Sequence, residues 1–144
     1  MPALPTRTSL PPPVARFRLR VTAGDAIFVG PGKISLLEAI RETRSITAAA
    51  KSLGMSYRRA WVLVDELNRS LASAAVASAI GGEHGGGSVL TELGHELVDV
   101  YRRIETTAAR ACAKDLGRLL QLVAPEKTTS RSAGKKPSSG RAPR

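Results

Sequence analysis

Polar and apolar residues alternate near the start of the chain. Over 16–21 arginines alternate with Phe17, Leu19 and Val21, which predicts a half-buried strand with one arginine face. A turn at 23–25 and a return strand over 26–29 would complete a hairpin. The arginine face (Arg16, Arg18 and Arg20) either discourages strand addition or contacts nucleic acid.

The spacing then becomes helical, and apolar positions predict a first helix from about 33 to 43. Ser45 is a good N-cap for a short second helix, and Gly54 should end that helix in a left-handed conformation. Ser56 can cap a third helix, whose apolar positions are Ala60, Val64 and Leu67. A short helix, a turn containing glycine and a capped helix are typical of a helix-turn-helix.

The segment that follows is typical of a wing. A strand over 75–80, a glycine-rich tip over 81–87 and a partner strand from Val89 predict a β-hairpin. Residues 70–79 are mostly alanine, serine and valine, so the first wing strand is expected to be weakly anchored. Thr91 should then cap a single long helix with an apolar stripe over 93–123. About 33 helical residues would span about 50 Å, more than a small domain needs for its own core.

Composition and charge narrow the function. Aromatic residues make up only 3% of the 144 residues, so the core must be aliphatic, and the single cysteine excludes an internal disulfide and a cysteine-based zinc site. The net charge is +10, but residues 23–124 carry 12 basic and 11 acidic side chains, so the excess lies in the ends. The Pro-rich segment 1–15 and the basic tail 125–144 are expected to be disordered, and the tail could add non-specific DNA affinity.

The sequence lacks the residue patterns that enzymes and metal-binding proteins require. We find no paired carboxylates, no nucleophile with a base and no metal-ligand set, so we expect neither an enzyme nor a metal site. No apolar run approaches the roughly 18–20 residues of a membrane helix, and we expect a protein of the reducing cytoplasm, associated with the nucleoid.

The order of these motifs resembles the N-terminal DNA-binding domain of the ModE family of molybdate-responsive regulators. The resemblance covers roughly 16–110 and is carried by Gly30-Pro31-Gly32, Leu36-Leu37-Glu38-Ala39-Ile40, Ser45-Ile46-Thr47-Ala48-Ala49-Ala50, Gly54-Met55-Ser56-Tyr57-Arg58-Arg59-Ala60-Trp61, Asp65-Glu66-Leu67-Asn68, the wing glycines and Leu90-Thr91-Glu92-Leu93-Gly94. The helix-turn-helix is more distantly similar to that of LysR-type regulators.

The resemblance implies a mainly α winged helix-turn-helix with small β elements, which dimerises and binds operator DNA. Full-length members add molybdate-binding β domains of about 70 residues each. Residues 111–144 show neither β patterning nor the signature of those domains, so no molybdate cofactor is expected.

The candidate DNA contacts follow from the predicted third helix, because its first turn offers free N–H groups and enters the major groove in this class. They are Thr47, Ser56, Tyr57, Arg58, Arg59, Trp61, Gly85 and Gly86. Solvated arginines are the alternative for Arg58 and Arg59, a second capping hydroxyl for Thr47, and core packing for Trp61. The wing glycines either approach a phosphate backbone or only make the hairpin flexible, and His84 is a weak candidate at the tip.

The stripe on the long helix predicts a C2 homodimer that sets two recognition helices about 34–36 Å apart, one turn of DNA. The expected interface residues are Leu97, Tyr101, Ile104, Ala108, Leu116 and Leu119, and Cys112 is expected to be a buried, inert thiol. The organisation is then a winged domain over 16–110 and the end of the dimerisation helix over 111–124. The alternatives to a regulator are an interaction subunit that forms mixed dimers with a full-length regulator, and a sequence-tolerant architectural DNA-binding protein.

Overall fold

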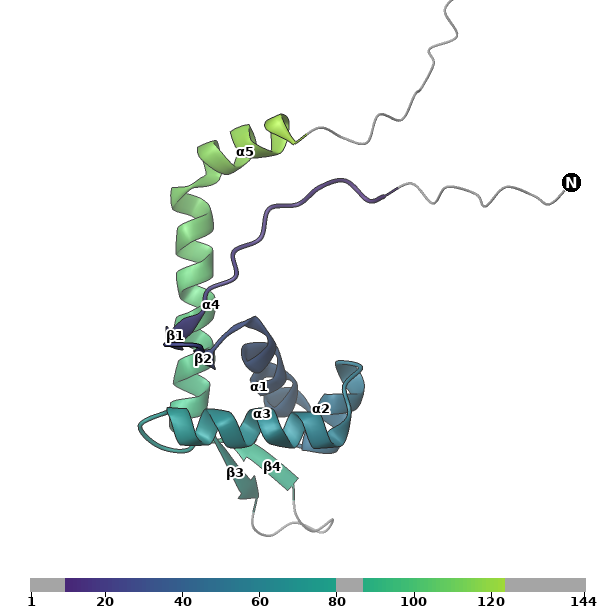
Figure 1. Ribbon diagram of the computed structural model, residues 1–144. Helices are drawn as coiled ribbons and strands as arrows, with labels where there is room; N and C mark the ends of the chain where they lie inside the picture. The colour runs from purple at the N-terminus through teal and green to yellow at the C-terminus, as the bar shows by residue number, and fades with distance from the viewer. Residues whose placement is uncertain (1–9, 80–86, 124–144) are drawn as a thin grey trace, which may run out of the picture. The chain divides into compact units, whose positions relative to one another are not determined.

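The computed structural model describes residues 10–79 and 87–123. The chain divides into two units, of which Arg16–Cys112 is one, and α5 belongs to the other. The candidate contacts Gly85 and Gly86, with His84 and the tail over 125–144, lie outside the described residues. The elements in chain order are β1 (Val21–Ala23), β2 (Ala26–Val29), α1 (Pro31–Thr43), α2 (Ile46–Ser52), α3 (Tyr57–Ser70), β3 (Val76–Ala79), β4 (Gly87–Leu90), α4 (Glu92–Ala111) and α5 (Ala113–Leu122) (Figure 1).

The N-terminal hairpin is shorter than the alternation predicts. β1 and β2 pair antiparallel around Gly24, but β1 begins only at Val21, so the strand expected over 16–21 is wrong for five of its six residues. The reason lies in the partner strand, because β2 ends at Val29 and Pro31 starts α1 immediately afterwards. The segment before Val21 is instead held by the hydroxyl of Tyr101, which donates to the carbonyl of Leu19 at 2.8 Å.

The helix-turn-helix forms as predicted. The hydroxyl of Ser45 accepts from the backbone N–H of Ala48 and caps α2, and that of Ser56 caps α3 in the same way. Gly54 has φ +67°, the left-handed conformation expected after α2. The backbone N–H of Met55 donates to the carbonyl of Ala50 at 3.0 Å, which closes the turn between the two helices.

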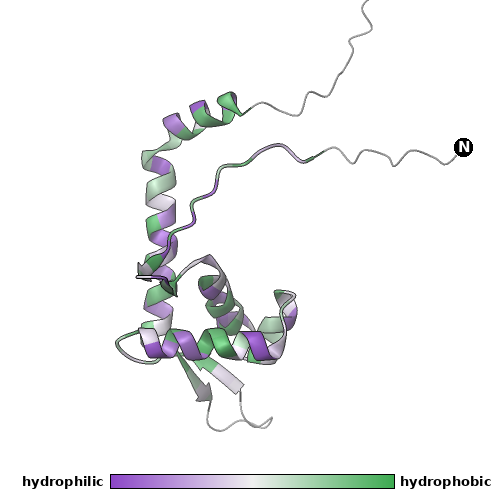
Figure 2. Cartoon of the chain, viewed as in Figure 1, coloured by the Kyte–Doolittle hydropathy of each residue, from purple (hydrophilic) through white to green (hydrophobic). Residues whose placement is uncertain are grey.

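The core is aliphatic and lies among α1, α2, α3 and α4. Its largest fully buried side chains are Ile34, Leu36, Leu37, Ile40, Leu67 and Val98. The predicted positions Ala60, Val64 and Leu67 of α3 are all buried, and apolar and polar residues alternate along this helix in Figure 2. Burial of this face fixes which side of α3 is turned outward.

The wing is anchored more firmly than expected. Ala75 and Val76 are buried, and the Oδ1 atom of Asn68 accepts from both of their backbone N–H groups, at 2.9 and 3.2 Å. The Asn68 amide also donates to the carbonyl of Val76. The prediction of a weakly anchored first strand is therefore wrong, because the hydrogen bonds of one polar side chain on α3 anchor a strand whose own side chains are small.

The wing also contacts both neighbouring helices. The backbone N–H of Ser88 donates to the carbonyl of Arg44, just after α1, and that of Thr91 donates to the carbonyl of Ala75. Gly94 lies so close to the wing that a Cβ atom there would be 2.2 Å from the carbonyl oxygen of Ala75. The wing is thus tied to α1 and α4 as well as to α3.

The expected single long helix is two helices. The hydroxyl of Thr91 caps α4 as predicted, but the helix ends at Ala111, and Cys112 follows as its C-cap with φ −101° and ψ 8°. The apolar stripe continues through this position, because periodicity reports which residues share a face and not whether backbone hydrogen bonding continues. Cys112 is half-buried, so the expectation of a buried thiol is also wrong.

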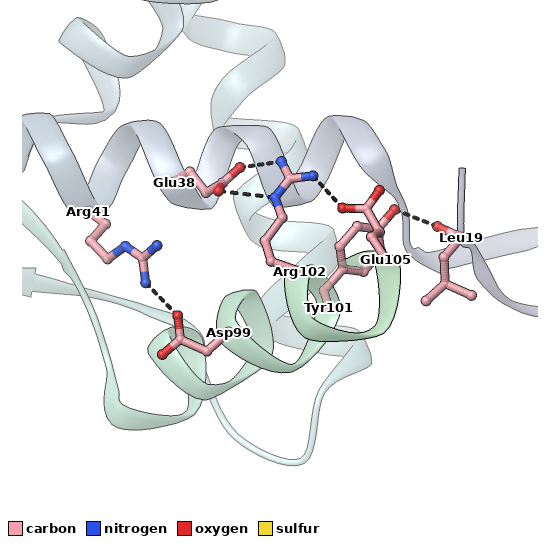
Figure 3. Close-up of polar contacts among 7 residues, drawn as sticks. All are labelled: Leu19, Glu38, Arg41, Asp99, Tyr101, Arg102 and Glu105. Carbon is pink, nitrogen blue, oxygen red and sulfur yellow. Dashed lines mark hydrogen bonds and ion pairs between the residues drawn. The ribbon is translucent and has the colours of Figure 1, made fainter. Parts of the chain in front are cut away.

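Polar contacts fasten α4 to α1 (Figure 3). The guanidinium of Arg102 contacts both carboxylate oxygens of Glu38 and one carboxylate oxygen of Glu105. A second ion pair joins Arg41 of α1 to Asp99 of α4 at 3.0 Å. Hydrogen bonds to Glu38 raise the pKa of the Arg102 guanidinium above its usual range, against the opposing effect of burial. These contacts, from Asp99 to Glu105, hold the middle of α4 against α1.

Candidate nucleic-acid interface

The first turn of α3 forms the centre of the candidate interface. The hydroxyl of Ser56 accepts from the backbone N–H of Arg59 at 3.1 Å, so this predicted contact residue serves as the helix cap. Tyr57, Arg58 and Arg59 are exposed in the same turn. A helix N-terminus favours negative charge through its N–H groups and its dipole, and two arginines add full positive charges. The turn is therefore suited to contact a nucleic acid.

Trp61 lies on the outside of α3, one turn beyond Tyr57. Its side chain is 48% exposed and that of Tyr57 is 52% exposed, while the neighbouring Ala60 is fully buried. The indole Nε1–H of Trp61 donates a hydrogen bond to the hydroxyl of Tyr57. The packing interpretation of Trp61 is therefore wrong, and the ring belongs to the exposed surface of the helix.

The two arginines of the turn have different surroundings. Arg59 lines a groove of about 690 Å³ beside α3, and Arg58 does not. Arg20, Arg69 and the buried Lys33 line the same groove. The ammonium of Lys33 donates to the carbonyl of Ile27 at 2.6 Å and lies 3.3 Å from a Glu66 carboxylate oxygen, so its charge is already paired.

Arg69 was not among the residues that the sequence predicted for this site, and Arg20 was offered only as part of an arginine face that could contact nucleic acid. Arg20 was one of three alternating arginines, and only the packing of the N-terminal segment brings it to the groove that Arg59 lines. Arg69 also pairs with Asp65 at 3.0 Å within α3. Two acidic side chains line the groove as well, those of Asp25 and Glu66. The lining is therefore of mixed charge, and among the residues that the structure describes Arg20 and Arg59 are its basic side chains without an ion pair.

Thr47 lies exposed in the first turn of α2. The cap hydrogen bond of that helix comes from Ser45, so the second-cap interpretation of Thr47 has no support in the geometry. The two helix starts are held by the closed turn around Gly54, which fixes Thr47 and the α3 turn within one rigid motif.

The proposed interface positions on α4 and α5 differ in exposure. Tyr101 is 3% exposed and packs inside its own domain, so it does not belong to an outer face. Ile104 and Leu119 are 47% and 54% exposed, and Leu97, Ala108 and Leu116 are half-buried. On α4 the outer apolar face also contains Val100, which the stripe read from the sequence omitted.

The arrangement defines a class of protein. A core of helices, a tight turn between the second and third of them and a β-hairpin directly after the third constitute a winged helix-turn-helix, a fold typical of DNA-binding domains. Among the residues that the structure describes, no helix has the length and apolar character needed to cross a bilayer.

Comparison with known proteins specifies the type. Over 82 residues the chain is 44% identical to the molybdenum-pterin-binding protein MopB of Rhodobacter capsulatus, covering 57% of this chain and 30% of that protein. Over 87 residues it is 38% identical to the DNA-binding transcriptional dual regulator ModE of Escherichia coli (strain K12), covering 60% of this chain and 33% of the regulator. The chain thus carries a ModE-like winged helix-turn-helix, and the resemblance expected from the sequence is confirmed.

The chain spans about a third of the length of these relatives. Among solved structures, the chain is similar to one in the crystal structure of the CbnR_DBD–DNA complex, with a TM-score of 0.49 and 23% identity over 61% of this chain and 95% of that one. No protein-family model matches the chain.

Proposed function

We propose that the chain is a sequence-specific DNA-binding transcriptional regulator that acts as a homodimer. The observation that carries the proposal is the first turn of α3, where Ser56 caps the helix and the side chains of Tyr57, Arg58 and Arg59 are exposed together. This is the part of a helix-turn-helix that enters the major groove. Relatives named as transcriptional regulators support the same role.

The geometry suggests different roles for the basic residues. Arg58 is free to reach base edges, where arginine takes guanine in a bidentate manner. Arg59 and Arg20 line one groove, so they are suited to hold phosphates, which position a protein without reading sequence. We expect Thr47, which is exposed at the start of α2, to contact the phosphate backbone of the DNA.

The experiment is selection of duplexes from a randomised library by the wild-type protein, followed by affinity measurements on the selected duplex at stated salt concentrations. Arg58→Ala is expected to weaken binding by about 1–3 kcal/mol and to relax the preference at one position. Arg59→Ala is expected to weaken binding to all sequences and to reduce the salt slope by about one. Arg103→Ala, which removes an exposed arginine of α4, is the matched control and should bind normally.

Normal binding by an Arg58→Ala, Arg59→Ala double variant with an intact fold would refute the role of α3. Binding without any preferred sequence would instead show an architectural protein, for which the ratio of specific to non-specific affinity is the measure. The first result rejects α3 as the element that reads DNA, and the second rejects the proposed sequence-specific function.

The exposed apolar faces of α4 and α5 support the homodimer. Ile104 on α4 is 47% exposed and Leu119 on α5 is 54% exposed, and large apolar side chains exposed on a helix are typical of an interface. An Ile104→Glu, Leu119→Glu variant should be a monomer of 15.2 kDa by light scattering, with near-native helicity and weaker operator binding. A wild-type monomer at micromolar concentration, or a variant that remains dimeric, would exclude this interface.

Two further parts of the proposal concern the cellular compartment and the need for a cofactor. A DNA-binding regulator would act in the cytoplasm, associated with the nucleoid. We further propose that the winged helix-turn-helix of this chain binds DNA without molybdate.

A further inference from the structure

The Tyr57–Trp61 pair on α3 has a defined hydrogen-bond polarity. The two residues are four positions apart and therefore neighbours on one face of the helix. The indole Nε1–H donates to the Tyr57 hydroxyl, and both side chains are about half exposed. The pair lies in the first two turns of α3, next to Arg58, so it belongs to the surface that would face a DNA groove.

This hydrogen bond decides what each side chain can offer a ligand. Indole has one donor and no acceptor, so Trp61, once its N–H is used, presents only an apolar ring. A hydroxyl that accepts a hydrogen bond keeps its own proton free and becomes a better donor through polarisation. The pair therefore presents a hydrogen-bond donor, the Tyr57 hydroxyl, beside an apolar surface, the Trp61 ring.

The four bases differ in how well they match that pattern in the major groove. Thymine presents the O4 acceptor beside the C5-methyl group, and it is the one base with both features. Guanine and adenine offer acceptors without a methyl group, and cytosine offers an N4 donor. A donor next to an apolar surface is therefore complementary to thymine.

We propose that Tyr57 and Trp61 together read a thymine, the Tyr57 hydroxyl donating to O4 and the Trp61 ring contacting the methyl group. Trp61 has a second role as a positioning residue, because its N–H occupies the acceptor side of the hydroxyl. This proposal rests on the proposed function, since it requires that α3 enters the major groove. A phosphate contact by Tyr57 is the competing outcome, and it would carry no base preference.

The first test uses the unmodified protein and modified DNA. In the duplex selected by the wild-type protein, each thymine is replaced in turn by deoxyuridine, which lacks the methyl group, or by 5-methylcytosine paired with guanine, which keeps the methyl group but replaces O4 by an amino donor. At one thymine in each half-site, deoxyuridine should weaken binding about fourfold, the factor for one buried methyl group. The 5-methylcytosine substitution there should weaken it roughly five- to 150-fold, as for a mismatched pair.

The second test assigns the two features to the two residues. Tyr57→Phe should retain the deoxyuridine penalty but reduce the discrimination against 5-methylcytosine. Trp61→Phe should do the same, because it keeps a ring and removes the N–H that orients the hydroxyl. Trp61→Ala should remove the deoxyuridine penalty. Tyr101→Phe changes the other tyrosine of the chain and should leave both preferences as in the wild type.

The outcomes separate this proposal from the proposed function. A selected sequence with no thymine sensitive to both replacements overturns the thymine reading and leaves the regulator role intact. Losses in the Tyr57 and Trp61 variants that are equal for every base at every position indicate a phosphate contact and overturn it as well. Selection that enriches no sequence rejects the proposed function, and the thymine reading with it.

Discussion

Replacement of Gly94 by alanine tests the contact between α4 and the wing. In an exposed helix this change would stabilise by up to about 1 kcal/mol, because alanine is the better helix former. Here the new Cβ atom would lie 2.2 Å from the carbonyl oxygen of Ala75, whereas ordinary contacts begin at 3.4 Å. Helix and wing must therefore separate by about 1 Å.

The cost follows from what Ala75 does in the fold. Its carbonyl accepts from the backbone N–H of Thr91 at 2.9 Å, so a shift strains or breaks that hydrogen bond. Overpacking costs about 1–3 kcal/mol and a lost hydrogen bond about 0.5–1.5 kcal/mol. After subtracting the gain in helix propensity, Gly94→Ala should lower the free energy of unfolding by about 1–3 kcal/mol.

Thermal unfolding followed by circular dichroism measures this change, at about 4–8 °C per kcal/mol for a domain of this size. The matched control is Gly32→Ala in α1, where a Cβ atom would meet nothing within 4 Å. The control should melt at or slightly above the wild-type temperature. A Gly94→Ala protein as stable as the control would refute the close packing of α4 against the wing.

Other predictions concern polar contacts and the proposed lack of a cofactor. Asn68→Ala should lower stability by about 1–3 kcal/mol in urea unfolding, because it leaves backbone groups of Ala75 and Val76 unpaired in a partly buried site, and an unchanged midpoint would contradict this. Arg102→Ala should cost about 1 kcal/mol at low salt and less at 1 M salt, since the pair with Glu38 is partly exposed; a cost independent of salt would refute the electrostatic explanation. Burial, and after it the negative charge of Glu105, raises the pKa of the Tyr101 hydroxyl. The tyrosine of the unfolded chain therefore ionises first, and the wild type should lose stability as the pH rises above the ordinary tyrosine pKa of about 10. In thermal melts at alkaline pH, Tyr101→Phe should lose less stability over the same range. Molybdate should leave the melting temperature unchanged, whereas a ligand at 100 times its Kd would stabilise by about 2.7 kcal/mol, so a clear rise would reveal a missed site.

The sequence by itself determined the elements that depend on local interactions. The caps at Ser45, Ser56 and Thr91 and the left-handed Gly54 were predictable, because each requires only a side chain and the backbone within a few residues. The buried face of α3 followed from spacing alone, since one helical period fixes which residues share a side. The sequence alone therefore predicted the capped first turn of α3.

Tertiary structure decided the features that need a distant partner. The arginine-rich strand stops short because the partner strand ends at Val29 and α1 begins at Pro31. The wing is anchored because the side chain of Asn68 on α3 bonds to the backbone of Ala75 and Val76. Tyr101 lies on the apolar stripe that predicted a dimer interface, yet it is buried within its own domain, where its hydroxyl donates to the carbonyl of Leu19, 82 residues away in the chain. Trp61 is the opposite case, because its large apolar ring suggests burial but is half exposed. The neighbouring residue Ala60 occupies the buried position of α3 instead. Periodicity shows which face of its own helix a side chain lies on. Whether that face is buried depends on which other elements pack against it, and those contacts are made by residues far apart in the chain.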